Sequence, residues 1–225
     1  TDGPSHVLSA INVSYLLLFV NLTNLCLNIA PFISRCMPRV FIIHGWDGHP
    51  QECWFPWLKK ELEARGFEVH VPEMPDPSSP KIETWVPYLT SCVGTPDDST
   101  YFVGHSIGVQ TIVRYLQTID RPVGGVIAVA GFYTLTTGCL GPDEMLIAEP
   151  WLRTFIDDEA VKRNARKITA IFSDTDRFVP VENAKFFEQR LNAKTIILSH
   201  KGHFGTRDSA LEVPEILTEF LSMSS

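Results

Sequence analysis

The stretch Ser99-Thr-Tyr-Phe-Val-Gly-His-Ser-Ile-Gly-Val-Gln-Thr-Ile-Val-Arg-Tyr-Leu116 decides the fold of this chain. The residues Tyr-Phe-Val before position 104 are typical of a strand, and the apolar residues after position 106 recur at helical spacing. Between them, Gly104-His-Ser106-Ile-Gly108 fits the G-x-S-x-G pattern of a sharp strand-to-helix turn that exposes a serine hydroxyl. Glycine is expected at both ends because larger side chains would collide with the neighbouring strand and helix. The segment therefore favours Ser106 as a nucleophile over Ser106 in an ordinary turn.

Composition limits the class of protein. The 225 residues are 44% hydrophobic and 20% charged, which is enough for one α/β domain with a sizeable core. The net charge of −7 argues against a nucleic-acid partner, because such binding needs a basic surface. The five cysteines are odd in number and lack C-x-x-C spacing, which predicts reduced thiols and a cytoplasmic protein.

Residues 1–36 form an N-terminal extension that does not share the pattern of residues 37–225. Positions 7–33 are apolar and uncharged, but four asparagines make them a poor membrane span, since each amide would need a partner in hydrocarbon. Three interpretations stay open: a weak anchor that gives membrane association, an extra helix packed on the domain, or an extension upstream of a start at Met37. Membrane contact is the less favoured of these.

Strand and helix patterns alternate from residue 37 onward. Positions 131–150 lose periodicity and predict a small lid. The alternation predicts an open parallel sheet with helices on both faces and a ligand site beyond the carboxyl ends of the strands. Besides the strand and helix around Ser106, we expect strands at 39–44, 67–71, 123–130, 167–172 and 194–198, and helices at 53–65, 82–93, 151–166, 181–191 and 210–223.

A serine nucleophile needs a base and an acid that orients the base, and on this scaffold they follow in the order Ser, acid, His. Only His200 and His203 come after Ser106, and His203 is preferred because flanking glycines let its loop turn inward. Asp174 and Asp176 both follow the preceding strand; Asp176 is favoured, and Asp174 is interpreted as a residue that caps the turn. No third ligand accompanies the two histidines, so we expect no metal and no cofactor.

The turn after the 39–44 strand supplies a second element of the predicted site. The backbone N–H groups of Trp46 and Ile107 are the expected donors to an oxyanion. Phe132 and Phe178 follow strand ends and are the best candidates for pocket walls. The remaining histidines are interpreted as structural, with His44 bonding across the oxyanion loop and His105 as the variable residue of the elbow.

Several local signatures together point to a known family. They are His44-Gly-Trp-Asp-Gly48, Trp54-Phe-Pro-Trp-Leu-Lys-Lys-Glu-Leu62, Met74-Pro-Asp-Pro77, Gly104-His-Ser-Ile-Gly108, Asp176-Arg-Phe-Val-Pro180 and Gly202-His-Phe204. From residue 37 nearly to the end, the chain resembles the small serine hydrolases of the YdeN-like and retinoblastoma-binding-protein-like family. The resemblance implies an α/β-hydrolase fold, a three-layer αβα sandwich with a six-stranded, mainly parallel sheet, and a triad of Ser106, Asp176 and His203.

These observations predict a metal-free serine hydrolase that cleaves small esters or amides through an acyl-enzyme. The short lid favours small substrates over long lipids. The alternative is a hydrolase-fold module that binds a protein partner and has little or no catalytic activity. The acyl group, the leaving group and the oligomeric state do not follow from the sequence.

Overall fold

Six strands form one parallel sheet in the computed structural model, which describes residues 37–225. The predictions for residues 1–36, including the domain boundary, lie outside the described residues. The strand order is β2-β1-β3-β4-β5-β6, and every neighbouring pair is parallel. The strands are β1 (Arg39–Ile43), β2 (Glu68–His70), β3 (Thr100–His105), β4 (Gly125–Val129), β5 (Ile168–Ser173) and β6 (Lys194–Leu198).

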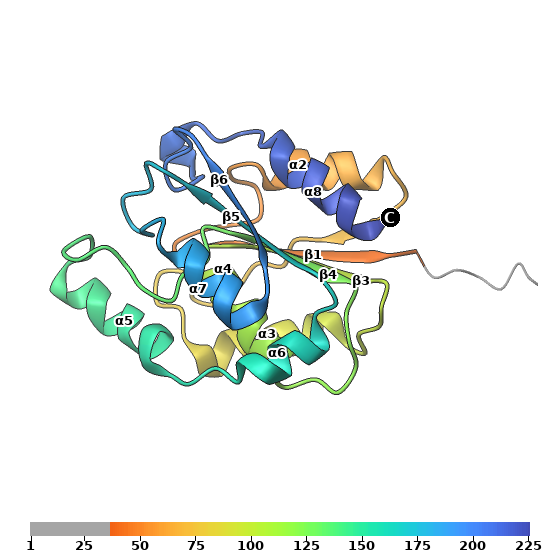
Figure 1. Cartoon of the computed structure of the whole chain (residues 1–225), viewed down its shortest axis with the longest axis horizontal. Helices are drawn as coiled ribbons and strands as arrows, with labels where there is room; N and C mark the ends of the chain where they lie inside the picture. The colour runs from red at the N-terminus through yellow and green to blue at the C-terminus, as the bar shows by residue number, and fades with distance from the viewer. Residues whose placement is uncertain (1–36) are drawn as a thin grey trace, which may run out of the picture. The chain divides into compact units, whose positions relative to one another are not determined.

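Helices cover both faces of the sheet, as Figure 1 shows. The helices α2 (Phe55–Glu63) and α8 (Pro214–Ser224) lie on one face. The other face carries α3 (Ile82–Val93), α4 (Ile107–Leu116), α6 (Asp158–Asn164) and α7 (Asn183–Leu191). A short 3-10 helix, Thr206–Asp208, precedes α8. The predicted three-layer arrangement is therefore confirmed for this part of the chain.

The core consists of two apolar layers separated by the sheet. Successive residues of a strand point to opposite faces, so Phe102 packs in one layer and Val103 in the other. All five residues of β4 are buried because helices cover both of its faces. This double burial explains why the central strands are continuous apolar runs in the sequence.

The prediction for residues 131–166 was wrong in one respect. The expected helix at 151–166 is two helices, because α5 (Pro142–Arg153) begins inside the predicted lid and α6 begins at Asp158. The Glu144 carboxylate accepts the Gly141 N–H at 2.7 Å and caps α5, and Asp157 accepts the Ala160 N–H at 3.0 Å and caps α6. Residues 131–141 are irregular, and α5 lies on the side to which the carboxyl ends of the strands point (Figure 1).

Residues 37–225 contain no helix that is both long enough and apolar enough to cross a bilayer. The cysteines within the same range, Cys53, Cys92 and Cys139, are free thiols. No group of three or more His, Cys, Asp or Glu side chains gathers into a metal-binding arrangement in this part of the chain.

Candidate active site

The turn at Ser106 is a strained connection between β3 and α4. Ser106 has φ 54° and ψ −120°, a backbone conformation that residues with a side chain seldom adopt. A Cβ at Gly108 would lie 2.4 Å from the Ile43 carbonyl oxygen, and one at Gly104 would lie 2.7 Å from Ile112 Cδ1. The two glycines therefore let α4 start directly against the ends of β1 and β3, and Ser106 lies at the carboxyl end of the sheet.

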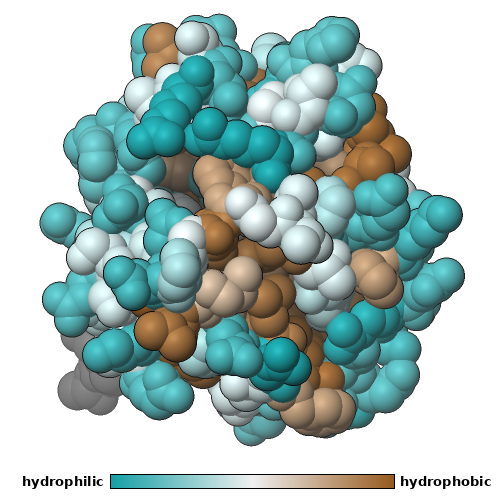
Figure 2. Space-filling view, turned by 90° about the vertical axis from the view of Figure 1, so that its left-hand side faces the viewer, coloured by the Kyte–Doolittle hydropathy of each residue, from teal (hydrophilic) through white to brown (hydrophobic). Residues whose placement is uncertain are grey.

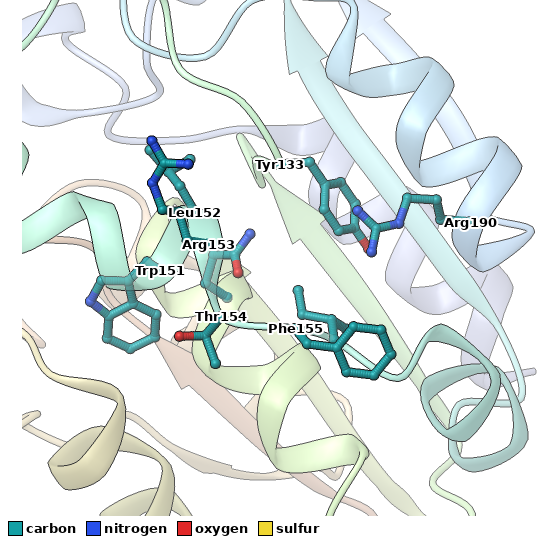
Figure 3. A pocket seen from close by; sticks show the side chains of 9 residues that line it. Tyr133, Trp151, Leu152, Arg153, Thr154, Phe155 and Arg190 are labelled. Carbon is teal, nitrogen blue, oxygen red and sulfur yellow. The ribbon is translucent and has the colours of Figure 1, made fainter.

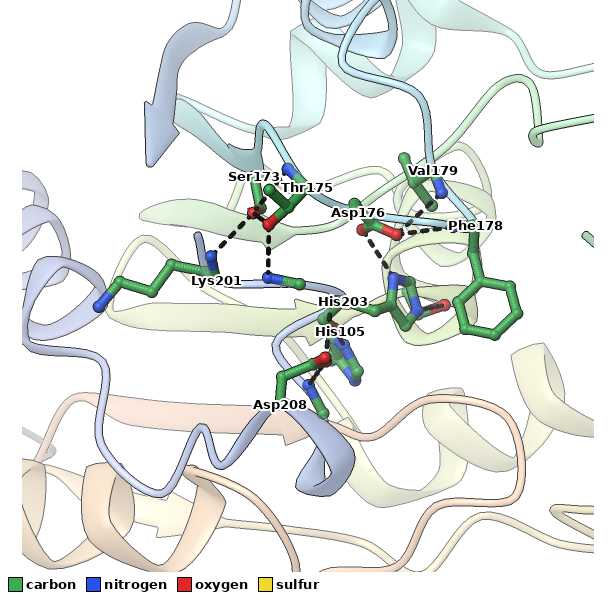
Figure 4. A network of polar contacts seen from close by, with 12 residues as sticks. His105, Ser173, Thr175, Asp176, Phe178, Val179, Lys201, His203 and Asp208 are labelled. Atoms are coloured by element: carbon green, nitrogen blue, oxygen red, sulfur yellow. Dashed lines mark hydrogen bonds and ion pairs between the residues drawn. The ribbon is translucent and has the colours of Figure 1, made fainter. Parts of the chain in front are cut away.

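Three of the predicted site residues form one chain of hydrogen bonds. Ser106 Oγ lies 3.0 Å from His203 Nε2, and His203 Nδ1 lies 2.7 Å from Asp176 Oδ2. The second carboxylate oxygen, Asp176 Oδ1, accepts the backbone N–H groups of Phe178 and Val179 at 2.9 and 3.0 Å (Figure 4). These two donors fix the orientation of the Asp176 carboxylate, which in turn fixes the plane of the imidazole.

The two residues considered as alternatives lie outside this chain of bonds. Asp174 Oδ1 accepts the backbone N–H of His200 at 2.8 Å, and this bond lowers the pKa of the exposed Asp174 carboxyl. Asp174 was expected to cap its own turn; it instead joins the loop after β5 to the loop after β6. Asp174 and His200 therefore help to hold the two loops that carry Asp176 and His203.

The loop that carries His203 is anchored by several further bonds that the sequence did not reveal. Asp208 Oδ2 accepts the N–H of His203 at 2.9 Å and that of Gly205 at 3.1 Å. On the other side of the loop, the Ser173 hydroxyl accepts the N–H of Lys201 at 3.0 Å (Figure 4). Because these partners come from β5 and from the segment before α8, the backbone of His203 is fixed from two directions.

His105, interpreted from the sequence as a variable position, also contacts this loop. Its Nε2 lies 2.7 Å from the His203 carbonyl oxygen, and the two rings are 5.0 Å apart. Burial lowers the pKa of His105 to about 3, and the nearby His203 acts in the same direction. The neutral ring must carry its proton on Nε2 to donate to that carbonyl. A single sequence holds no signal for this contact, because the two residues are far apart in the chain.

The loop after β1 lies against Ser106. A Cβ at Gly45 would be only 3.4 Å from Ser106 Cβ. In this loop, the backbone N–H of Asp47 donates to the Pro77 carbonyl at 2.8 Å, and the backbone N–H of Gly48 donates to the Gly45 carbonyl at 3.2 Å. Trp46 directly precedes these two donors in the chain. Ile107 is the first residue of α4, where a backbone N–H has no acceptor within its own helix.

The proline-rich segment 72–80 braces this loop, a role that was not predicted. The Met74 N–H donates to His44 Nε2 at 3.0 Å, so the His44 proton is on Nδ1, which donates to the Gly45 carbonyl at 2.8 Å. Burial lowers the pKa of His44 and keeps its ring neutral. The Trp46 indole N–H donates to the Ser78 carbonyl at 3.0 Å. The expectation that His44 bonds across the loop is thus confirmed.

The two predicted wall residues differ in their surroundings. The Phe178 ring is partly buried and meets the His203 ring edge-on at 5.1 Å between centroids. Phe132 is only 3% exposed and packs in the core layer that holds α3, α4 and α7. Phe178 therefore contacts the imidazole directly, whereas Phe132 lies deeper.

The arrangement defines a class of protein. A parallel sheet with a serine at the turn between β3 and α4, followed in the chain by an aspartate after β5 and a histidine after β6, is an α/β-hydrolase. The family model described as "Serine hydrolase" matches residues 40–221. The chain therefore belongs to the serine hydrolase family.

Curated relatives and solved structures agree with this assignment. The chain is 31% identical over 189 residues to the hydrolase YdeN of Bacillus subtilis (strain 168), covering 82% of this chain and 96% of YdeN. It is 29% identical over 156 residues to the serine hydrolase RBBP9 of Rattus norvegicus, covering 67% of this chain and 77% of RBBP9. The resemblance inferred from the sequence signatures is thus confirmed.

The crystal structure of the B. subtilis ydeN gene product matches with a TM-score of 0.75 at 29% identity, over 82% of this chain and 97% of that one. Est1E of Butyrivibrio proteoclasticus, solved with ferulic acid, matches with a TM-score of 0.60 at 15% identity, over 82% of this chain and 90% of that one. At that identity, the second likeness concerns the fold alone.

Proposed function

We propose that this serine hydrolase cleaves small esters or amides by acyl transfer through Ser106, His203 and Asp176. The observation that carries the proposal is the hydrogen-bonded chain from Ser106 Oγ through both nitrogens of His203 to Asp176 Oδ2. A nucleophile, a base within hydrogen-bond reach and a group that orients the base are the parts that such a reaction needs.

The reaction begins when Ser106 Oγ attacks the substrate carbonyl carbon and its proton passes to His203 Nε2. The tetrahedral intermediate collapses, the carbon–leaving group bond breaks, and His203 returns the proton to the departing alcohol or amine. A water molecule then attacks the acyl-enzyme, again giving its proton to His203, and the acid leaves as Ser106 recovers its proton. Asp176 keeps the Nδ1 proton of His203 in place and stabilises the imidazolium that forms.

The backbone N–H groups of Trp46 and Ile107 are proposed to bind the oxyanion. Support comes from their position, since Ile107 follows the nucleophile and the Gly45 neighbour of Trp46 lies against Ser106. The bonds from segment 72–80 to this loop keep it in one conformation, so the donors need little rearrangement when charge develops.

The proposed acyl pocket is apolar. Figure 2 shows the face to which the carboxyl ends of the strands point, where apolar surface gathers in the centre within a polar rim. The partly buried side chains Trp46, Leu135 and Phe178 follow β1, β4 and β5 and belong to this side of the molecule. Phe178, with Phe132 beneath the surface, is proposed as the wall beside the reacting carbonyl, which suits a small apolar acyl group.

Labelling with a fluorophosphonate, together with a panel of p-nitrophenyl esters and aminoacyl amides, tests the proposal. Ser106→Ala should abolish covalent labelling and lower turnover by roughly three to six orders of magnitude, while the exposed-site control Ser91→Ala should behave as the unmodified chain. Stoichiometric labelling of Ser106→Ala would refute the nucleophile assignment. An unmodified chain that neither labels nor turns over any substrate would favour the protein-binding alternative.

A further inference from the structure

A cavity that includes none of the proposed acyl-pocket residues lies among α4, α5, α7 and the segment that joins α5 to α6. Its volume is about 190 Å³, which corresponds to about six water molecules. Its polar lining includes Gln110 on α4, Tyr133 after β4 and Arg190 on α7, and its apolar lining includes Trp151 and Phe155. None of these residues has a part in the proposed hydrolysis.

A buried positive charge lies beside the cavity. Arg114 is only 1% exposed, and its guanidinium bonds Gln110 Oε1 and the carbonyl oxygens of Trp151 and Thr154, at 2.8 and 3.1 Å for the two carbonyls. All of these acceptors are neutral, and within residues 37–225 the buried Nε has no acceptor. Burial lowers the pKa of Arg114 to about 10, so the side chain keeps its charge at neutral pH. The residues that supply these acceptors line the cavity, so the charge of Arg114 lies directly behind the cavity wall.

Tyr133 presents an unused donor at the same place. Its hydroxyl oxygen is buried and has no hydrogen-bond partner among the described residues. Burial is the main cause that raises the pKa of Tyr133, so the hydroxyl keeps its proton. An unpaired buried hydroxyl destabilises a folded protein, and a ligand oxygen at this point would remove that cost.

Arg190 completes the polar side of the cavity. Its guanidinium carbon lies 3.9 Å from the Tyr133 ring centroid, and Figure 3 shows its head group beside the Tyr133 hydroxyl. Asp158 accepts from Arg190 Nε at 2.7 Å and from Nη2 at 3.1 Å. The third nitrogen, Nη1, donates to no other residue within 37–225, so it is available to a ligand.

The opposite side of the cavity is apolar. Phe155 lies at the edge of the cavity and is 80% exposed, whereas Trp151 is only 1% exposed and offers a ligand almost no ring surface. In Figure 3 the Phe155 ring lies below the Tyr133 hydroxyl and the Arg190 head group. A ligand that joins one anionic group to an apolar body would contact both sides.

We propose that this cavity binds a small carboxylate with an apolar body. The carboxylate oxygens accept from the Tyr133 hydroxyl and from Arg190 Nη1, close to the charge of Arg114, and the apolar body packs against the ring of Phe155. A phosphate is less suitable because it has no apolar part to cover this ring, and because it would lose a stronger hydration shell than a carboxylate.

Calorimetric titration of the full chain with benzoate tests the proposal. Tyr133→Phe removes only the hydroxyl and should weaken benzoate binding about tenfold, as expected for a lost bond to a charged group. The control Tyr88→Phe, at a partly exposed tyrosine on α3, should leave the affinity unchanged. The ligand-free melting temperature of Tyr133→Phe should equal or exceed that of the unmodified chain, because an unpaired buried hydroxyl is removed.

Other outcomes would overturn the proposal. They are an absence of saturable benzoate binding, binding of inorganic phosphate but not of benzoate, and equal affinities of Tyr133→Phe and the unmodified chain. Benzoate binding that is weakened by Phe178→Ala rather than by Tyr133→Phe would place the ligand beside Ser106 and also overturn it. Titration of Ser106→Ala should give unchanged affinity, so this test stands even if the proposed hydrolysis fails.

Discussion

His105 and His203 are joined by a hydrogen bond of 2.7 Å from the His105 ring to the His203 carbonyl oxygen. The residue before the proposed nucleophile thereby holds the backbone of the proposed base. His105 is joined to Ser106 by the peptide bond, and the Ser106 hydroxyl is hydrogen-bonded to the His203 ring. The bond from His105 to the His203 carbonyl therefore closes a small ring of contacts around the Ser106–His203 hydrogen bond. The neutral form of His105 suits this position, since a second positive charge beside a protonated His203 would oppose proton transfer.

From this contact we expect His105 to position His203. His105→Leu removes the donor and should lower kcat at least tenfold with little change in KM, because a small misplacement of a catalytic group can cost up to about 10² in rate. His105→Gln keeps an N–H donor and should recover part of the rate. Steady-state kinetics on the best p-nitrophenyl ester measures both. A rise in KM without a fall in kcat, or equal kcat for the two variants, would contradict a positioning role.

The choice between the two aspartates leads to a second prediction. Asp176→Asn removes the charge that orients His203 and should lower kcat by roughly 10⁴, the effect known for such a change in a serine protease triad. Asp174→Asn is the matched control, because its carboxylate contacts a backbone N–H of the same loop but not the imidazole. Measuring kcat of both variants shows which aspartate orients His203. Similar losses of turnover would show that loop anchoring, rather than orientation of the ring, is what both residues provide.

Some of these site residues could be predicted from the sequence alone, and others could not. Chain order and the strand pattern located Asp176 and His203, because on a parallel sheet the loops after successive strands meet at one edge. Strand limits were also predictable, since strands buried on both faces are unbroken apolar runs. Local signals at Gly141 and Asp157 were present but were not recognised, so the helix after β4 was predicted too late and too long.

Contacts between loops were not predictable from one chain. The bonds from segment 72–80 to His44 and Trp46 join positions about thirty residues apart, and segment 72–80 contributes only backbone groups to them, which carry no residue-specific signal. The His203 carbonyl that His105 binds is also a backbone group, so the sequence gives no signal for that contact either. Arg114 gave no signal either, because an arginine in an amphipathic helix is normally expected on the exposed face.

The close packing at the turn predicts a severe effect for a single methyl group. Gly108→Ala would place a Cβ 2.4 Å from the Ile43 carbonyl oxygen and should lower the free energy of unfolding by about 1–3 kcal/mol. It should also abolish labelling of Ser106 as α4 moves away. Gly141→Ala is the control, since the nearest atom to its Cβ would be a side-chain oxygen at 3.5 Å and its φ is −72°. Urea unfolding measures both. A Gly108→Ala protein as stable as Gly141→Ala would contradict the packing described for β1 and α4.

The buried histidines predict a loss of stability in acid. The pKa of His105 is about 3 in the folded protein, below its ordinary value of about 6.5. As pH falls below 6.5 the unfolded chain therefore binds a proton at this residue while the folded chain does not. Stability is present above pH 6.5 and is lost as pH falls toward 3, at up to about 1.4 kcal/mol per pH unit for one proton. His44, whose pKa is also lowered by burial, acts in the same direction.

Urea unfolding between pH 5 and 8 measures how steeply the free energy of unfolding falls as the pH decreases. This fall should be less steep for His105→Gln than for the unmodified chain. It should be unchanged for the control His49→Gln, whose ring is exposed. If His105→Gln and the unmodified chain lose stability at the same rate below pH 6.5, then His105 is protonated in the folded protein and cannot be the neutral donor that holds His203.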